Sequence, residues 1–141
     1  MIEFRLIEST NIYSVIPLLK VLDDSIALNI LKQRLTKMMA QGYQCVGIYD
    51  GKKLIGACGM WFLTKYYVGD HVEPDNVILL PAHRHQGIGK QLMEWIYNYA
   101  KSKGCVASEL NCYISNEPGR KFWEGEGYQA IGLHYQKKLW S

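Results

Sequence analysis

The chain has 141 residues, 48% of them hydrophobic and 21% charged, and carries a formal net charge of +3 at pH 7. This length and composition predict one soluble domain with a single hydrophobic core. The basic residues are scattered among acidic ones, without the run of like charges typical of a nucleic-acid arm or a membrane anchor. We therefore expect no nucleic-acid partner and no membrane partner.

The chain opens with one predicted strand and two predicted helices. IEFRLI has the alternation of a strand, and residues 9–22 place their apolar side chains on one helical face. Pro17 fits this helix only in a first turn or at a kink. Residues 23–42 predict a second helix, with Asp24 as its N-cap.

The next elements are predicted to be a hairpin and a third strand. Residues 43–66 form two β-prone runs around Asp50-Gly51, a dipeptide that favours a tight antiparallel turn because it tolerates positive φ. Residues 71–80 predict another strand, and Pro74 suggests an irregularity near its start.

The second half predicts a helix from Ile88 to Gly104, a strand over 105–114 and a shorter helix from Glu117 to Glu124. Two closing strands, over 127–133 and 134–140, complete the prediction. The order β-α-α-β-β-β-α-β-α-β-β describes an α/β domain built on a mixed sheet.

The cysteines show no CxxC pair and no zinc-like spacing, and they lie in apolar stretches, so we expect reduced, buried thiols. The opening MIEFRLIEST has an acid at position 3 and only a short apolar run, unlike a signal peptide, and no stretch approaches the roughly 18 apolar residues of a membrane span. These features predict a cytoplasmic protein.

The stretch RHQGIGK, residues 84–90, connects the third predicted strand of this region to a helix. A glycine-rich turn at a helix N-terminus leaves backbone N–H groups free and favours a phosphate. Gly87 and Gly89 let the backbone approach a ligand closely, and Arg84 and Lys90 can add positive charge.

Two common phosphate motifs do not fit this stretch. A Walker A loop needs Ser or Thr where this chain has Gln91. A dinucleotide fingerprint needs a third glycine where it has Leu92. The sequence therefore predicts a different phosphate-bearing cofactor, against the alternative that the glycines only make a tight turn.

RHQGIG matches the Arg/Gln-x-x-Gly-x-Gly/Ala signature of the GNAT superfamily of N-acetyltransferases, with Leu79 and Pro81 placed as in that family's upstream pattern. NEPGRKFWEGEGY, residues 116–128, is similar to the family's downstream segment. The resemblance implies a single GNAT-like domain over residues 1–141. It implies a mixed, mostly antiparallel central sheet of about seven strands with about four helices, splayed in the middle to admit CoA.

The same resemblance implies that acetyl-CoA is the co-substrate and that its acetyl group passes directly to a primary amine in a ternary complex. A backbone N–H near Leu79 or Leu80 would stabilise the oxyanion. The implied cofactor-binding residues are Ile78, Leu79, Leu80, Arg84, His85, Gln86, Gly87, Ile88, Gly89, Lys90 and Asn116.

A carboxylate is expected to take the proton from the acceptor's ammonium, directly or through a water. Glu73 is the first candidate, and it shares a strand face with His71 and Asp75 if the strand is regular. Asp75 is the second catalytic candidate, and both Asp75 and His71 rank behind Glu73.

The general acid departs from the family pattern. Trp123 stands where the family commonly has the tyrosine that protonates the CoA thiolate, and an indole N–H is not a usable acid. Either the thiolate leaves unprotonated, or Tyr113 or a water supplies the proton. Packing in the core is the expected role of Trp123.

His83 and His85 flank Arg84 without a nearby acid or cysteine, so we expect no metal. The expected acceptor is a small-molecule amine, because aromatic residues lie beside acidic ones where the family's acceptor site opens. These residues are Trp61, Tyr66, Tyr67, Asp70, His71 and Glu73.

Three other functions stay open. A protein lysine or N-terminus would need a wide groove, and a non-catalytic CoA-binding sensor is favoured by Trp123. An acetyltransferase that acts on aminoacyl-tRNA would need a continuous basic face, which the mild charge disfavours. Exposed sheet edges and the C-terminal KKLWS favour a homodimer.

Overall fold

The computed structural model describes residues 1–140; Ser141, the last residue of KKLWS, lies outside the described residues. The chain forms two compact units, Met1–Glu109 and a second one that begins at Leu110. The elements of the first unit are β1 (Ile2–Leu6), the 3-10 helix η1 (Ser9–Val15), α1 (Ile16–Leu22), α2 (Leu28–Ala40), β2 (Gln44–Asp50), β3 (Lys53–Lys65), β4 (Gly69–Leu79), the 3-10 helix η2 (Pro81–His83), α3 (Ile88–Ser102) and β5 (Ala107–Ser108). The second unit contains α4 (Glu117–Gly125).

The five strands form one sheet in the order β1-β2-β3-β4-β5. The first four strands pair antiparallel, whereas β5 pairs parallel to β4. This last pairing joins only His71 to Ala107 and Val72 to Ser108. Strand β4 continues to Leu79, so β5 leaves the outer edge of its second half uncovered. The mixed, mostly antiparallel α/β fold predicted from the sequence is confirmed.

The hairpin and helix predictions hold in most details. Gly51 has φ 63°, as the tight turn between β2 and β3 requires. Pro17 lies in the first turn of α1, where a missing N–H costs nothing. The predicted cap Asp24 is wrong: Ala27 precedes α2. The side chain of Asp23 instead accepts a hydrogen bond from the Ser25 N–H at 2.9 Å, which makes a local turn and delays the helix.

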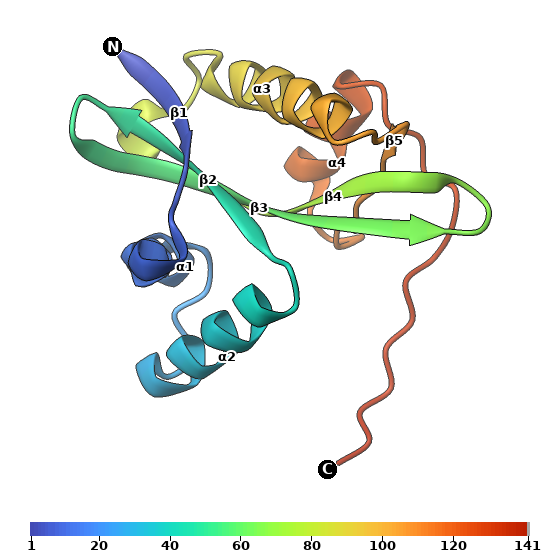
Figure 1. The fold of residues 1–141 in the computed structure, drawn as a ribbon, viewed down its shortest axis with the longest axis horizontal. Coiled ribbons are helices and arrows are strands. Elements are labelled where there is room, and N and C mark those ends of the chain that lie inside the picture. Colours follow the sequence, from blue (N-terminus) through green and yellow to red (C-terminus); the bar gives the residue numbers. More distant parts are fainter. Residues whose placement is uncertain (141) are drawn as a thin grey trace. The chain divides into compact units, whose positions relative to one another are not determined.

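The helices of the first unit cover both faces of the sheet, with α1 and α2 on one side and α3 on the other (Figure 1). The main apolar cluster joins η1, α1 and α2 to the sheet through residues such as Leu35 and Cys45. On α3, Leu92, Met93 and Ile96 are fully buried. The period of α3 therefore matches its predicted amphipathic pattern.

The prediction of seven strands is wrong, because the sheet has five. Within the described residues, the predicted strand 105–114 is reduced to Ala107–Ser108, and the segments 127–133 and 134–140 form no strand. Apolar side chains in these segments are exposed, including Ile131 at 78% and Leu133 at 70%. An alternating pattern makes a segment suited to a sheet, but a strand exists only where a neighbour completes its hydrogen bonds.

None of the helices in residues 1–140 combines the length and the apolar character that crossing a bilayer needs.

Candidate active site

A buried histidine and two glutamates gather beside β4. The Nε2 atom of His71 lies 2.8 Å from Oε2 of Glu73 and 4.0 Å from Oε1 of Glu109. His71 is fully buried, whereas the side chains of Glu73 and Glu109 are 18% and 19% exposed. The pairing of β4 with β5 brings Glu109 to this point, since its N–H donates to the Val72 carbonyl at 3.0 Å. We call His71, Glu73 and Glu109 the acidic cluster.

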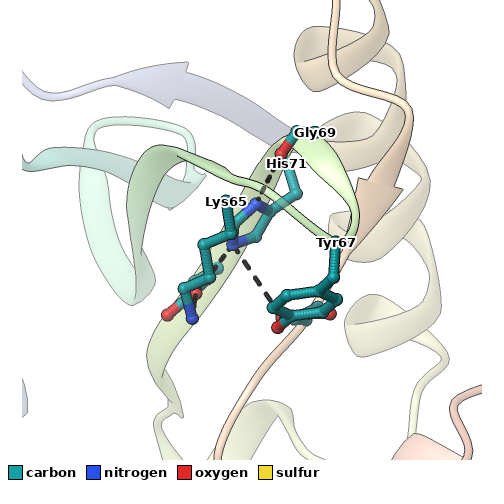
Figure 2. A network of polar contacts seen from close by, with 6 residues as sticks. Lys65, Tyr67, Gly69 and His71 are labelled. Carbon is teal, nitrogen blue, oxygen red and sulfur yellow. Dashed lines mark hydrogen bonds and ion pairs between the residues drawn. The ribbon is translucent and has the colours of Figure 1, made fainter.

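The turn between β3 and β4 contributes two further polar groups to the acidic cluster (Figure 2). The Lys65 ammonium lies 3.2 Å from Oε2 of Glu73. The Tyr67 hydroxyl donates to Oε1 of Glu109 at 2.5 Å. The buried imidazole of His71 therefore forms the back of the cluster. The more exposed side chains of Lys65 and Tyr67 form its solvent side.

Both ring nitrogens of His71 face oxygen atoms. Nδ1 lies 3.1 Å from the carbonyl oxygen of Gly69, and Nε2 lies 2.8 Å from the Glu73 carboxylate (Figure 2). A carbonyl and an ionised carboxylate are both acceptors. An N–H on either ring nitrogen therefore has an oxygen acceptor directly in front of it.

These contacts change the acidities in the cluster. Partial burial pushes the pKa of Glu73 upward, but hydrogen bonds from His71 and Lys65 outweigh it, so the pKa lies below its ordinary value. The hydrogen bond to Glu73 raises the pKa of Lys65. The hydrogen bond to Glu109 raises the pKa of the Tyr67 phenol. Glu73 and Lys65 thus stabilise each other as an ion pair.

Asp75 has a different partner from Glu73. The β3–β4 register runs without a shift from Gly69 to Asp75, so Pro74 does not change the phase and the two acids share a face. The Trp61 indole N–H donates to Oδ2 of Asp75 at 3.0 Å. Glu73 touches His71, whereas Asp75 is held by an indole.

A β-bulge lies beyond Asp75 in β4. Gly59 pairs with Asp75 and Ala57 with Ile78, so one residue of β3 opposes two of β4. Asn76, one of these two, has φ 58°. The bulge inserts one residue and therefore reverses which backbone groups face each edge of β4.

The bulge distinguishes the two N–H groups proposed for the oxyanion. The N–H of Leu80 donates to the Ile55 carbonyl at 2.9 Å and is therefore committed to β3. Because backbone groups of successive residues point to opposite edges, the N–H of Leu79 faces away from β3, toward the edge that β5 leaves uncovered. Of the two, only the Leu79 N–H has the direction that an oxyanion site on this edge needs.

The predicted phosphate loop connects η2 to α3. Gly87 has φ 77° and immediately precedes the helix, and His85 also has a positive φ of 64°. The first hydrogen bond of α3 runs from the Gln91 N–H to the Gly87 carbonyl. The N–H groups of Ile88, Gly89 and Lys90 precede that bond at the positive end of the helix dipole, and no side chain caps them.

The side chains of the loop differ in their hydrogen bonds and in their exposure to solvent. Nε of Arg84 donates to the Leu79 carbonyl at 3.0 Å, which ties the loop to the end of β4. The Gln86 amide donates to the Ala82 carbonyl at 3.4 Å. The side chains of His85 and Lys90 are exposed, and Ile88 is buried. The loop thus presents backbone N–H groups and two cationic side chains, Arg84 and Lys90, on one short segment.

Three residues singled out in the sequence belong to the second unit. Asn116 caps α4, where its Oδ1 accepts from the Gly119 N–H at 3.1 Å. Trp123 packs edge-to-face against Phe122 and Tyr128, with ring centroids 4.9 and 5.3 Å away. Tyr113 is 85% exposed. The cofactor role of Asn116 and the acid role of Tyr113 remain predictions.

The acidic cluster is also the group among the described residues that could ligate a metal, since one ligand atom from each of His71, Glu73 and Glu109 lies within 4.8 Å of the others. The Lys65 ammonium, 3.2 Å from the same Glu73 oxygen, already supplies positive charge there. The expectation of no metal stays a prediction.

Sequence reasoning named His71, Glu73 and Tyr67 but missed Glu109 and Lys65. Glu109 joins the cluster only because β5 pairs parallel with β4. No local pattern in the sequence predicts that pairing. Lys65 could have been found, because a hairpin ending at Lys65 and Gly69 places the lysine across from the start of β4.

Solved structures with this fold cover nearly the whole chain. An acetyltransferase of Trypanosoma brucei superposes with a TM-score of 0.79 and 21% identity over 99% of this chain and 100% of that one. The aminoglycoside N-acetyltransferase AAC(6')-Iy in complex with CoA superposes with a TM-score of 0.84 and 16% identity over 99% of this chain and 95% of that one. At these identities the likeness establishes the fold.

A curated relative matches part of the sequence. Over 67 residues the chain is 31% identical to the aminoalkylphosphonate N-acetyltransferase of Salmonella typhimurium (strain LT2), a match that covers 48% of this chain and 44% of that protein. The match thus spans less than half of the relative's length. The profile of the Acetyltransferase (GNAT) family matches residues 18–128, which include the RHQGIG motif and the segment from Asn116 to Tyr128. The resemblance carried by those motifs is confirmed: the chain belongs to the Acetyltransferase (GNAT) family.

Proposed function

We propose that this protein transfers an acetyl group from acetyl-CoA to the primary amine of a small molecule, by direct attack in a ternary complex. The observation that carries the proposal is the arrangement of groups along β4 and the loop after it. One strand holds the Glu73 carboxylate, turns the Leu79 N–H toward an open edge after the bulge, and leads into the uncapped N-terminus of α3.

Acetyl-CoA binds, in this proposal, along the open edge of β4 and the start of α3. Its pyrophosphate accepts hydrogen bonds from the N–H groups of Gly89 and Lys90, with Arg84 adding charge. The pantetheine arm lies against Ile78–Leu80. The remaining predicted contacts are His85, Gln86, Gly87, Ile88 and Asn116. The chain acts as a single domain over residues 1–141.

The reaction needs no covalent enzyme intermediate. The amine nitrogen attacks the thioester carbonyl carbon, the resulting oxyanion accepts a hydrogen bond from the Leu79 N–H, and the C–S bond breaks to release CoA as a thiolate. A thiol pKa of about 8.5 makes that leaving group tolerable without an enzyme acid. Glu73 takes the amine's proton, directly or through a water, and passes it to solvent.

The names of the relatives, rather than the shape of a pocket, support a small-molecule acceptor. The curated relative is named for aminoalkylphosphonates, and one structural relative is an aminoglycoside N-acetyltransferase. Both names describe small molecules that carry primary amines. The acidic cluster on β4 suits the cationic form of such an amine.

A non-catalytic CoA-binding protein is the second candidate. It is favoured by Trp123, whose ring packs against Phe122 and Tyr128 where the family commonly has a catalytic tyrosine. In that case acetyl-CoA binds but no acceptor amine releases CoA.

The deciding experiment is calorimetric titration with acetyl-CoA, followed by measurement of thiol release against a panel of primary amines. Binding with amine-dependent release supports the enzyme, and binding without release supports the sensor. Gly89→Val should abolish binding because its side chain fills the place of the pyrophosphate. Gly132→Val is the control, since that glycine has open space around it. Unchanged affinity in Gly89→Val would remove the phosphate-loop argument.

A further inference from the structure

A primary ammonium already lies against the acidic cluster. The Lys65 Nζ atom lies 3.2 Å from Oε2 of Glu73, the carboxylate to which the proposed function assigns the acceptor's proton. Lys65 closes β3 and is paired with Gly69 across the turn, so its side chain reaches the cluster from the end of the hairpin (Figure 2).

The rear and the front of this arrangement differ in burial. His71 is fully buried and holds Glu73 from behind at 2.8 Å, so the carboxylate has a fixed position. The Lys65 side chain is 43% exposed. A long, half-exposed side chain can swing into solvent at little cost, since ion pairs of this kind contribute weakly. The carboxylate is therefore a preformed site, and the lysine is a removable occupant.

A cation is the replacement that restores the charge balance when Lys65 leaves. Removing the ammonium would leave the partly buried Glu73 carboxylate with a single donor, His71. The lysine ammonium lies against Glu73, whereas Oε1 of Glu109 accepts from the Tyr67 hydroxyl. An ammonium at the end of a slender alkyl chain restores the lost ion pair without disturbing the rest of the cluster.

We propose that Lys65 occupies the subsite for the acceptor's ammonium, and that an acceptor enters by displacing it from Glu73. The inference rests on the proposed function for the role of Glu73. The chemistry of the Lys65 side chain indicates the substrate class: a primary amine at the end of an unbranched alkyl chain, as in lysine itself. Lys65 is thus a built-in competitor that raises the acceptor concentration needed for turnover.

The first test is steady-state kinetics with acetyl-CoA and n-butylamine as the acceptor probe. Lys65→Met should lower the KM for n-butylamine about two- to fivefold, the range expected for loss of an exposed ion pair, with little change in kcat. Lys65→Arg keeps the charge and should keep the parent KM. Lys53→Met, at the other exposed end of β3, is the matched control. An unchanged or higher KM in Lys65→Met overturns the proposal.

The second test does not depend on turnover. Trace acetylation of the free protein with acetic anhydride should label Lys65 less than the exposed Lys52, because the ion pair with Glu73 protects its amine. Saturating n-butylamine should raise the Lys65-to-Lys52 labelling ratio, whereas 1-butanol, which lacks the ammonium, should not. A ratio that n-butylamine leaves unchanged overturns the subsite. Absence of turnover with a rising ratio instead overturns the proposed function alone.

Discussion

The Oε2 atom of Glu73 contacts two groups at once, the Lys65 ammonium and the His71 imidazole. This arrangement lowers the pKa of Glu73 and keeps it an anion. An anion of low basicity attracts an ammonium well but holds an abstracted proton only briefly. At the residue scale, the site is therefore better suited to binding the acceptor as a cation and relaying its proton to water than to storing that proton.

Replacement of Glu73 tests this role in catalysis. Glu73→Gln should lower kcat/KM for an amine acceptor about a hundredfold or more, because general-base assistance is lost. The loss should be largest at low pH, where unprotonated amine is scarce. Glu3→Gln, at an exposed position of β1, is the control. A Glu73→Gln variant with the parent's pH–rate profile would exclude Glu73 as the base.

The same substitution tests the ion pair in the folded state. The folded-state pKa of Glu73 is lowered from its ordinary value of 4.5. A lowered carboxyl pKa stabilises the fold above the unfolded-state pKa, and this contribution is lost as the pH falls through the folded-state pKa. The difference in unfolding free energy between the parent and Glu73→Gln should therefore be largest at neutral pH and shrink below about pH 4.5. Urea unfolding at several pH values measures it, and a difference that grows on acidification would contradict it.

At the element scale, the bulge in β4 decides which backbone groups reach the open edge. Before it, the Val72 carbonyl faces β5 and accepts from the Glu109 N–H. After it, Leu80 faces β3 and Leu79 faces outward. Pro74 in the sequence predicted an irregularity near this point, but the inserted residue lies at Asn76 and Val77, opposite one residue of β3.

The conformation of Asn76 offers a test of the bulge. Its φ of 58° is tolerated by Asn and Gly but strained for a β-branched side chain. Asn76→Val should destabilise the protein by about 1–2 kcal/mol and reduce turnover, because the relaxed strand would turn Leu79 away from the edge. Asn76→Gly should keep both stability and activity. Equal behaviour of the two variants in urea unfolding and thiol-release assays would argue against a functional bulge.

At the scale of the whole molecule, two of the four cysteines are buried in the core. Cys45 and Cys58 are 2% and 0% exposed. Burial raises the pKa of the Cys45 thiol to about 12 and raises that of Cys58 as well. Cys105 and Cys112 are only partly buried. The expectation of four buried thiols thus holds for the two on β2 and β3.

Thiol labelling separates these two pairs. In the native protein, Ellman's reagent should react with Cys105 and Cys112 first, and with Cys45 and Cys58 only after denaturant opens the core. Cys105→Ser should remove one fast thiol and leave the slow phase unchanged. Four thiols with a single rate in native buffer would contradict the burial of β2 and β3.

The sequence determined the local elements and the motif that names the family. Asp50-Gly51 predicted its turn, the period from Ile88 predicted α3, and RHQGIG predicted a loop with free N–H groups, because each depends on residues close together in the chain. Asp24 failed as a cap because the side chain of Asp23 formed a competing turn.

The tertiary structure alone decided the number of strands and the composition of the acidic cluster. Segments 127–133 and 134–140 have strand-like patterns but form no strand, because pairing depends on a distant partner. Glu109 reaches His71 through parallel pairing, and Leu79 rather than Leu80 faces the open edge because a bulge shifts the phase. Contacts between residues far apart in the chain depend on register, and register is set by the packed sheet rather than by any local run of residues.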